Sequence, residues 1–86
     1  MPNVAEVNDT LGWVYYKKDQ AALAIPPLLL SVGQDRSNPV FPYHLGLAYA
    51  KDRDKVKALE SFDEALRRNP NFREATEARL DLNLKN

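Results

Sequence analysis

Apolar and polar residues alternate with a helical period in the second half of the chain. Residues 55–68 read KVKALESFDEALRR, and the apolar positions recur every three or four residues. This spacing places the apolar side chains on one face of an α-helix and the charged side chains on the other. The stretch therefore predicts an amphipathic helix. Its apolar face consists of Ala58, Leu59, Phe62, Ala65 and Leu66, and its polar face of Lys57, Glu60, Asp63, Glu64 and Arg67.

A stretch in the first half has a different pattern. Residues 21–32 read AALAIPPLLLSV and include no charged side chain. A helix that is apolar on all sides is normally buried on all sides. Pro26 and Pro27 lack the amide N–H that a helix interior requires, so we expect a kink or a broken first turn there. We expect Gly33 to end this helix in a left-handed conformation.

Capping residues predict three more helices. Asn3 starts the first, which runs to about Lys18, and Asn38 with the following proline starts the third, which runs to about residue 51. Asn71 is expected to cap a fifth helix that runs to about residue 84, and Asp52 or Asp54 to cap the fourth. The residues expected to face neighbouring helices are Val7, Leu11, Val14 and Tyr15 in the first helix and Phe41, Leu45, Ala48 and Tyr49 in the third.

The chain contains an internal repeat. The motif Leu-Gly-x-x-Tyr occupies residues 11–15 and recurs at residues 45–49, an offset of 34 residues. A fixed period of this size indicates stacked helical repeats. Glycine inside a helix costs about 1 kcal/mol relative to alanine, so Gly12 and Gly46 indicate close contact between helices. The same offset relates two further apolar pairs, Ala24 with Ala58 and Leu28 with Phe62.

The spacing of these residues, followed by Pro70, resembles the tetratricopeptide repeat. The chain departs from the family pattern at the turn glycine, whose positions are occupied by Asp19 and Arg53. The resemblance implies one all-α domain over residues 1–86, an α-solenoid of two helix-turn-helix repeats at about 5–38 and 39–72. A C-terminal capping helix follows at about 71–84. The resemblance also implies a bacterial-type domain that acts as a non-enzymatic protein-interaction module.

Composition narrows the possible functions. The 86 residues carry 12 basic and 12 acidic side chains, so the sequence offers no basic face for nucleic acid. The absence of cysteine removes thiolate metal sites and disulfides, and no apolar run reaches the ~18 residues of a membrane span. We expect a soluble protein in the cytoplasm or periplasm without cofactor or metal. His44 has no acidic neighbour at helical spacing, so we expect a structural or exposed role and no catalytic site.

One candidate binding site is a groove lined by the first helix of each repeat. In families similar to this one these helices form a concave surface that holds a peptide or a partner helix, and aromatic side chains dominate many binding interfaces. We therefore expect an apolar segment to bind there, unless neighbouring repeats or the fifth helix cover the site. Acidic C-terminal tails are disfavoured because Asp9 occupies one of the slots where relatives carry Lys or Asn. The groove residues are Trp13, Tyr16, Tyr43 and Leu47.

A second candidate surface lies on the apolar helix at residues 21–32. Four of its apolar or proline positions correspond, 34 residues later, to charged residues. A large exposed apolar patch on a soluble domain usually indicates an interface. It could contact an adjacent repeat of a longer array, a dedicated partner or a second copy, and we expect concentration-dependent association, with a dimer as the simplest form. A purely structural, self-assembling fragment and an accessory domain of an enzyme remain alternatives. The surface consists of Leu23, Ile25, Pro26, Leu29 and Leu30.

Overall fold

The computed structural model describes residues 3–84, and this part of the chain folds into five α-helices. They are α1 (Val4–Lys17), α2 (Ala21–Gln34), α3 (Val40–Lys51), α4 (Lys55–Arg68) and α5 (Arg73–Leu84). The all-α class is therefore confirmed. None of these helices is long and apolar enough to cross a membrane.

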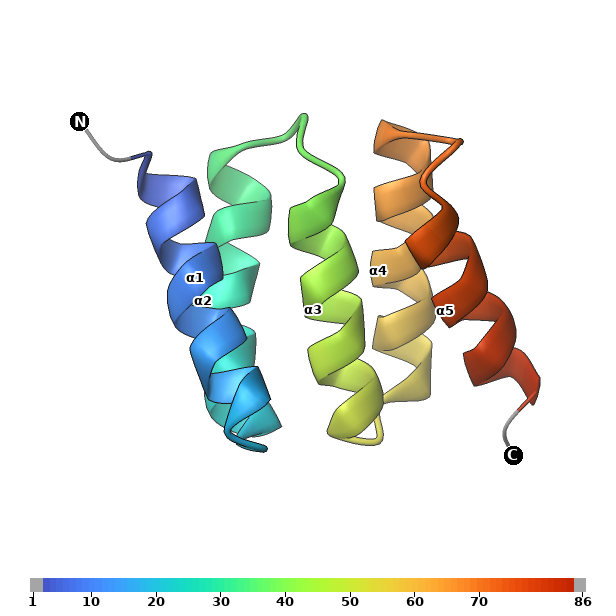
Figure 1. Ribbon diagram of the computed structural model, residues 1–86, viewed down its shortest axis with the longest axis horizontal. Helices are drawn as coiled ribbons and strands as arrows, with labels where there is room; N and C mark the ends of the chain where they lie inside the picture. Colours follow the sequence, from blue (N-terminus) through green and yellow to red (C-terminus); the bar gives the residue numbers. More distant parts are fainter. Residues whose placement is uncertain (1–2, 85–86) are drawn as a thin grey trace.

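The helices stand side by side as two antiparallel hairpins and a final helix (Figure 1). The closest pairings are α1 with α2, α3 with α4, and α2 with α3, which joins the two hairpins. α5 lies against α4 and touches α3. α1 stands at one end of the stack and α5 at the opposite end (Figure 1).

Side-chain caps begin three of the helices as expected. The Asn3 side chain accepts hydrogen bonds from two backbone N–H groups of the first turn of α1, and Asn38 accepts one from Val40. Asp54 caps α4 by accepting from the N–H of Lys57. The expected cap at Asn71 is wrong, because α5 begins only at Arg73. The backbone N–H of Asn71 instead donates to the Asn69 side chain within the preceding turn.

The turns inside the two hairpins have the same unusual backbone. Asp19 and Arg53 have φ values of 64° and 66°, in the left-handed region. The N–H of the next residue in each turn reaches back to a helix carbonyl, Gln20 to Tyr15 and Asp54 to Tyr49, each at 2.9 Å. This is the Schellman arrangement that ends many helices, usually with glycine at the left-handed position. Both hairpins therefore keep the turn geometry without the glycine.

α2 is continuous through its two prolines. Pro26 and Pro27 lie inside the helix, so the expected break is absent. Neither proline can donate to the carbonyl four residues earlier, and these carbonyls belong to Ala22 and Leu23, both of them exposed residues that water can reach. The expectation for Gly33 is also wrong, because its φ is not positive and α2 continues to the next residue.

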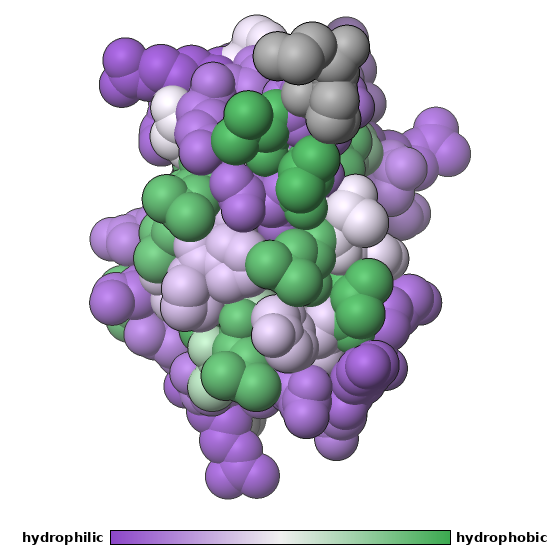
Figure 2. Space-filling view, turned by 90° about the vertical axis from the view of Figure 1, so that its left-hand side faces the viewer, coloured by the Kyte–Doolittle hydropathy of each residue, from purple (hydrophilic) through white to green (hydrophobic). Residues whose placement is uncertain are grey.

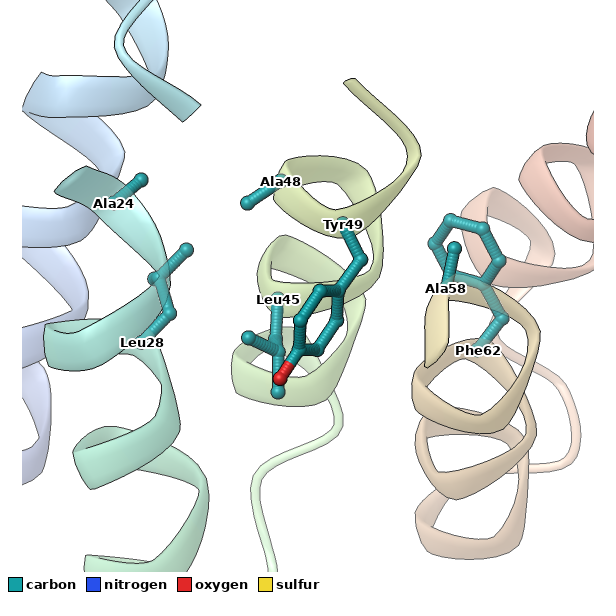
Figure 3. Packing of buried hydrophobic residues seen from close by; sticks show 7 residues of the cluster. All are labelled: Ala24, Leu28, Leu45, Ala48, Tyr49, Ala58 and Phe62. Carbon is teal, nitrogen blue, oxygen red and sulfur yellow. The ribbon is translucent and has the colours of Figure 1, made fainter. Parts of the chain in front are cut away.

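The core lies where α2, α3 and α4 meet. Leu28 from α2 and Leu45 from α3 point toward one another, and Phe62 lies on α4 beyond Tyr49 (Figure 3). The four α3 residues that the sequence predicts to face neighbouring helices are buried, so the predicted inner face of α3 is confirmed. The buried cluster consists of Ala24, Leu28, Leu45, Ala48, Tyr49, Ala58 and Phe62.

The two repeated glycines allow close helix contact, as the sequence predicts. A Cβ atom on Gly12 would lie 2.4 Å from Cγ of Leu28, and one on Gly46 would lie 2.4 Å from Cε1 of Phe62. Such distances are far inside van der Waals contact, so any side chain would push the helices apart. Each hairpin is therefore built around the same contact between a glycine and a large apolar residue.

The orientation expected for α1 is wrong for three of its four residues; the fourth, Tyr15, is half-buried and packs against the core as expected. Val7, Leu11 and Val14 are 52 %, 47 % and 44 % exposed, while the buried residues of α1 are Ala5, Asp9 and Gly12. The contact between Gly12 and Leu28 requires the small residues of α1 to face α2. The larger apolar residues therefore lie on the opposite side of the helix, at the N-terminal end of the stack.

Arg68, at the end of α4, ties the second hairpin to the first. Its side chain is only 6 % exposed, and its guanidinium donates to the backbone carbonyls of Val32, Asp35 and Asn38 at 2.9–3.0 Å. Its Nε donates to Glu64 at 2.9 Å. Because four acceptors surround one planar group, Arg68 fixes both the end of α2 and the loop that follows it.

The inter-hairpin loop is also held by a local turn. The Asp35 carboxylate accepts hydrogen bonds from the backbone N–H and the hydroxyl of Ser37, at 2.9 and 2.7 Å. These bonds favour the charged form and hold the pKa of the Asp35 carboxyl below its usual value. The loop between α2 and α3 is therefore ordered by its own side chains and by Arg68.

Candidate protein-binding groove

A groove of about 330 Å³ runs between α1, α3 and α5. Two of the four predicted groove residues line it, Tyr16 from α1 and Leu47 from α3. Phe62 of α4 reaches the same space. The remaining lining residues come from α3 and α5 and are Ala50, Lys51, Ala78, Asp81 and Leu82.

The other two predicted residues, Trp13 and Tyr43, belong to a row of aromatic rings across α1 and α3. Trp13 stacks on Tyr16 with centroids 4.9 Å apart and on His44 with centroids 4.0 Å apart. Tyr43 lies 5.8 Å from His44 and meets Phe72 edge-on at 5.2 Å. The four predicted residues are therefore close together, but Trp13 and Tyr43 already contact other rings of the chain.

His44 holds this row in place through a contact that sequence spacing misses. Its Nδ1 lies 2.8 Å from Oδ1 of Asp9, and the two side chains are only 16 % and 12 % exposed. Because a carboxylate accepts but does not donate, Nδ1 carries the proton of this bond. The acidic partner is 35 residues away on α1, so no search at i±3 or i±4 could find it. The expected structural role of His44 is consistent with this half-buried hydrogen bond.

Charged side chains lie at the edge of the aromatic row. The Lys51 ammonium sits 4.6 Å from the centre of the Tyr16 ring and 3.2 Å from the Asp19 carboxylate. The Lys17 ammonium lies 5.4 Å from the centre of the Trp13 ring. Cations over aromatic rings are held by the ring quadrupole. Lysine side chains therefore border the α1 side of the groove.

The Tyr43 hydroxyl is in an unfavourable environment for ionisation. Burial raises its pKa, and the negative charges of Glu74 and Glu77 and the hydroxyl of Tyr16 raise it further. Tyr43 is therefore a neutral hydrogen-bonding group at any physiological pH. Within residues 3–84 no group of three or more His, Cys, Asp or Glu side chains could hold a metal ion.

The second predicted surface, on α2, is largely exposed. Leu23, Leu29 and Leu30 are 54 %, 48 % and 54 % exposed, and Pro26 is exposed as well. Ile25 differs, because it is half-buried and packs against the core between α2 and α3. Figure 2 shows apolar side chains at the surface on the side of the molecule where α1 and α2 lie.

Comparison with known protein families bears on the second hairpin. Residues 43–72 match the family model described as tetratricopeptide repeat. No curated protein matches the chain in sequence. The matched segment includes Gly46, Arg53 and Phe62, the residues that form the close helix contact and the left-handed turn. Residues 43–72 are therefore similar to a tetratricopeptide repeat, and because the same contact and the same turn recur 34 residues earlier, the described chain forms a helical repeat domain.

Proposed function

We propose that the chain is a non-enzymatic interaction module that binds an apolar segment of a partner protein in the groove between α1, α3 and α5. The match of residues 43–72 to a tetratricopeptide repeat suggests that the chain is a protein–protein interaction module. The observation that carries the finer proposal is the groove itself, whose lining is mainly apolar side chains from α1, α3, α4 and α5.

The dimensions of the groove suit a few side chains rather than a whole domain. Its volume of about 330 Å³ lies at the lower end of the range of about 300–1,000 Å³ for ligand sites. Leu47, Ala50 and Leu82 supply apolar walls, while Lys51 and Asp81 provide one charge of each sign. A short helix or extended peptide with two or three apolar anchors fits this lining, with polar flanks near the two charged residues.

The structure changes which residues best test the groove. Trp13 and Tyr43 pack on other rings and do not line the groove, so replacing them would disturb ring packing without changing the lining. Tyr16→Ala and Leu47→Asp change lining residues directly. Val56→Asp on α4 is a matched control, because Val56 is 68 % exposed and does not line the groove.

A displayed library of random 12-residue peptides, with the chain as bait, provides the experiment. We expect enriched peptides to carry apolar residues at helical or alternating spacing, and their affinity for the Tyr16→Ala and Leu47→Asp variants to fall at least about tenfold. The Val56→Asp variant should bind as the parent does. Selected peptides that bind all three variants equally would rule out the groove as the binding site.

A second candidate function is self-association through α2. Its support is the exposure of Leu23, Leu29 and Leu30, each about half accessible to solvent. The same surface could instead contact a neighbouring repeat of a longer array or a dedicated partner. Leu29→Glu tests self-association, because a charge there should weaken any dimer that buries the α2 surface. Sedimentation equilibrium over a range of concentrations measures the effect.

A further inference from the structure

α1 carries an apolar stripe that has no partner within the described chain. Val4, Val7, Leu11 and Val14 follow one another at three- and four-residue spacing, so they lie on one side of the helix. They are 61 %, 52 %, 47 % and 44 % exposed. The stripe is on the opposite side of α1 from Gly12, which packs on α2. It therefore faces away from the rest of the stack.

α2 extends the same apolar region. Leu23 and Leu30 are two helical turns apart, so they lie on one side of α2, and each is 54 % exposed. Figure 2 shows apolar side chains on the α1 and α2 side of the molecule. We call this surface the N-terminal end face, and define it as Val4, Val7, Leu11, Val14, Leu23 and Leu30.

We propose that the N-terminal end face is the interface between two copies of this chain, with the two α1 helices packed antiparallel across a two-fold axis near Leu11. This proposal rests on the proposed self-association, with which it shares Leu23 and Leu30. It adds α1 as the centre of the contact. The α2 residue Leu29 lies outside the N-terminal end face.

A single two-fold axis can pair both α1 and α2 with the same helices of the second copy. Leu11 lies at the middle of the α1 stripe, and the midpoint between Leu23 and Leu30 falls at the two prolines of α2. Gly12 contacts both Ala24 and Leu28, which places the middle of α1 level with the middle of α2. A two-fold axis through this level sets Val7 against Val14 of the second copy and Leu23 against Leu30 of the second copy.

Charges beside the stripe favour the antiparallel arrangement. Glu6 and Lys17 are both exposed and are separated by 11 residues, or three helical turns, so they lie along the same flank of α1. An antiparallel pair brings Glu6 of each copy next to Lys17 of the other, which makes two equivalent ion pairs. A parallel two-fold pair puts this flank of the two copies on opposite sides of the seam, so it would form neither ion pair.

The opposite end of the stack does not complement the N-terminal end face. The exposed positions of α5 are mainly charged or polar, with Leu80 and Leu84 as the large apolar exceptions. A head-to-tail stack would take those charged side chains out of water and bury them against apolar side chains, which is unfavourable. The exposed charged residues of α5 are Arg73, Glu74, Glu77, Arg79 and Asp81.

The area of the N-terminal end face matches the needs of a dimer. Six half-exposed Val and Leu side chains amount to roughly 300–500 Å² of apolar surface per copy. A standard interface buries about 800 Å² per partner, of which somewhat more than half is apolar. The patch therefore supplies the apolar core of one standard interface, and Glu6 and Lys17 supply part of its polar rim.

Sedimentation equilibrium of the chain and its variants tests the proposal. We expect a mass approaching twice the 9.8 kDa of one chain at high concentration. Leu11→Glu places two carboxylates at the two-fold axis and should weaken the dimer at least about a hundredfold, since like charges across an interface are strongly unfavourable. The matched control is Leu80→Glu on α5, another exposed leucine, which should leave the dimer unchanged. Circular dichroism checks that both variants keep their helices.

A charge exchange tests the antiparallel orientation. Glu6→Lys alone should weaken the dimer about tenfold, because two ion pairs become two repulsions. The double variant with Glu6→Lys and Lys17→Glu should restore it. The chain contains no cysteine, so Leu11→Cys introduces a single thiol that should form a disulfide with its copy under mild oxidation. Leu80→Cys should not crosslink at the same protein concentration.

Three results would overturn the proposal. The first is a chain that remains monomeric at every concentration. The second is a dimer that Leu29→Glu disrupts and Leu11→Glu does not, in which case self-association through α2 stands and the α1 seam is wrong. The third is a double charge exchange that fails to restore the dimer, which would exclude the antiparallel pairing of α1.

Discussion

Replacing Arg68 with alanine should cost this domain a large part of its stability. The guanidinium donates to three backbone carbonyls at the junction between the two hairpins and to Glu64, and the side chain is 6 % exposed. Hydrogen bonds from a charged donor contribute about 1.5–3 kcal/mol each when partly buried. Water can replace some of them after truncation, so we expect a total loss of about 3 kcal/mol.

That loss is large relative to the whole domain. At about 0.05–0.15 kcal/mol per residue, a chain of this length has roughly 4–13 kcal/mol of stability. For a domain of this size each kcal/mol shifts the melting temperature by about 4–8 °C. The Arg68→Ala variant should therefore melt roughly 12–24 °C below the parent. Arg68→Lys keeps the charge but not the planar fork, and should lose about half as much.

Arg67 provides a matched control on the same helix. It donates to the other oxygen of Glu64 at 2.8 Å, but its side chain is 69 % exposed. An exposed pair of this kind contributes about 0–0.5 kcal/mol. Urea unfolding followed by circular dichroism gives the free energy of unfolding for each variant. If Arg67→Ala and Arg68→Ala differed by less than about 0.5 kcal/mol, the carbonyl contacts of Arg68 would have no role in joining the hairpins.

Four further substitutions test the fold and its dependence on pH. Arg53→Gly should stabilise by about 1 kcal/mol in urea unfolding, because φ is 66° there and left-handed backbone strains a residue with a Cβ; a loss of stability would contradict the turn geometry. Gly46→Ala should destabilise by about 1–2 kcal/mol, because its new Cβ would overlap the Phe62 ring, whereas Gly33→Ala, with open space around it, should stabilise by up to about 1 kcal/mol. Hydrogen bonds from Arg68 and Arg67 lower the pKa of the Glu64 carboxyl in the folded chain. The stability that this carboxylate contributes is therefore present above its unfolded pKa of about 4.3 and is lost as pH falls through the folded value. Urea midpoints measured from pH 6 downward should therefore fall less steeply for Glu64→Gln than for the parent.

Much of the helix arrangement is predictable because it depends on local chemistry. Asn3, Asn38 and Asp54 cap their helices through bonds to residues two or three positions away, so sequence spacing identifies them. The repeat offset also predicts the contacts of Gly12 and Gly46, because glycine is unfavourable inside a helix and its presence there indicates that a neighbouring helix packs closely against it.

The face that α1 buries is not predictable in the same way. A periodicity argument assigns the largest apolar residues to the core, but here the core contact is made by Ala5 and Gly12 because α2 supplies Leu28. The choice between two possible faces depends on the neighbouring helix. The periodicity argument therefore assigns the apolar stripe with Leu11 at its centre to the wrong side of α1.

Long-range polar contacts are also not predictable from the spacing of residues in the sequence. The pairing of His44 with Asp9 spans 35 residues, and Arg68 reaches carbonyls 30–36 residues away. Arg68 lies at the edge of an amphipathic pattern in which a charged side chain is normally assigned to solvent. Only the folded arrangement shows that the end of α2 and the loop after it offer Arg68 three carbonyl acceptors.

Trp13 lies at the contact between the two hairpins, so its fluorescence can report on that contact. It is the chain's single tryptophan, and its indole stacks on His44 of α3 at 4.0 Å. Its fluorescence therefore reports the separation of α1 from α3, whereas circular dichroism at 222 nm averages over all helices. If the two signals change at the same urea concentration, the hairpins unfold as one cooperative unit; if fluorescence changes first, the first hairpin detaches before the second melts.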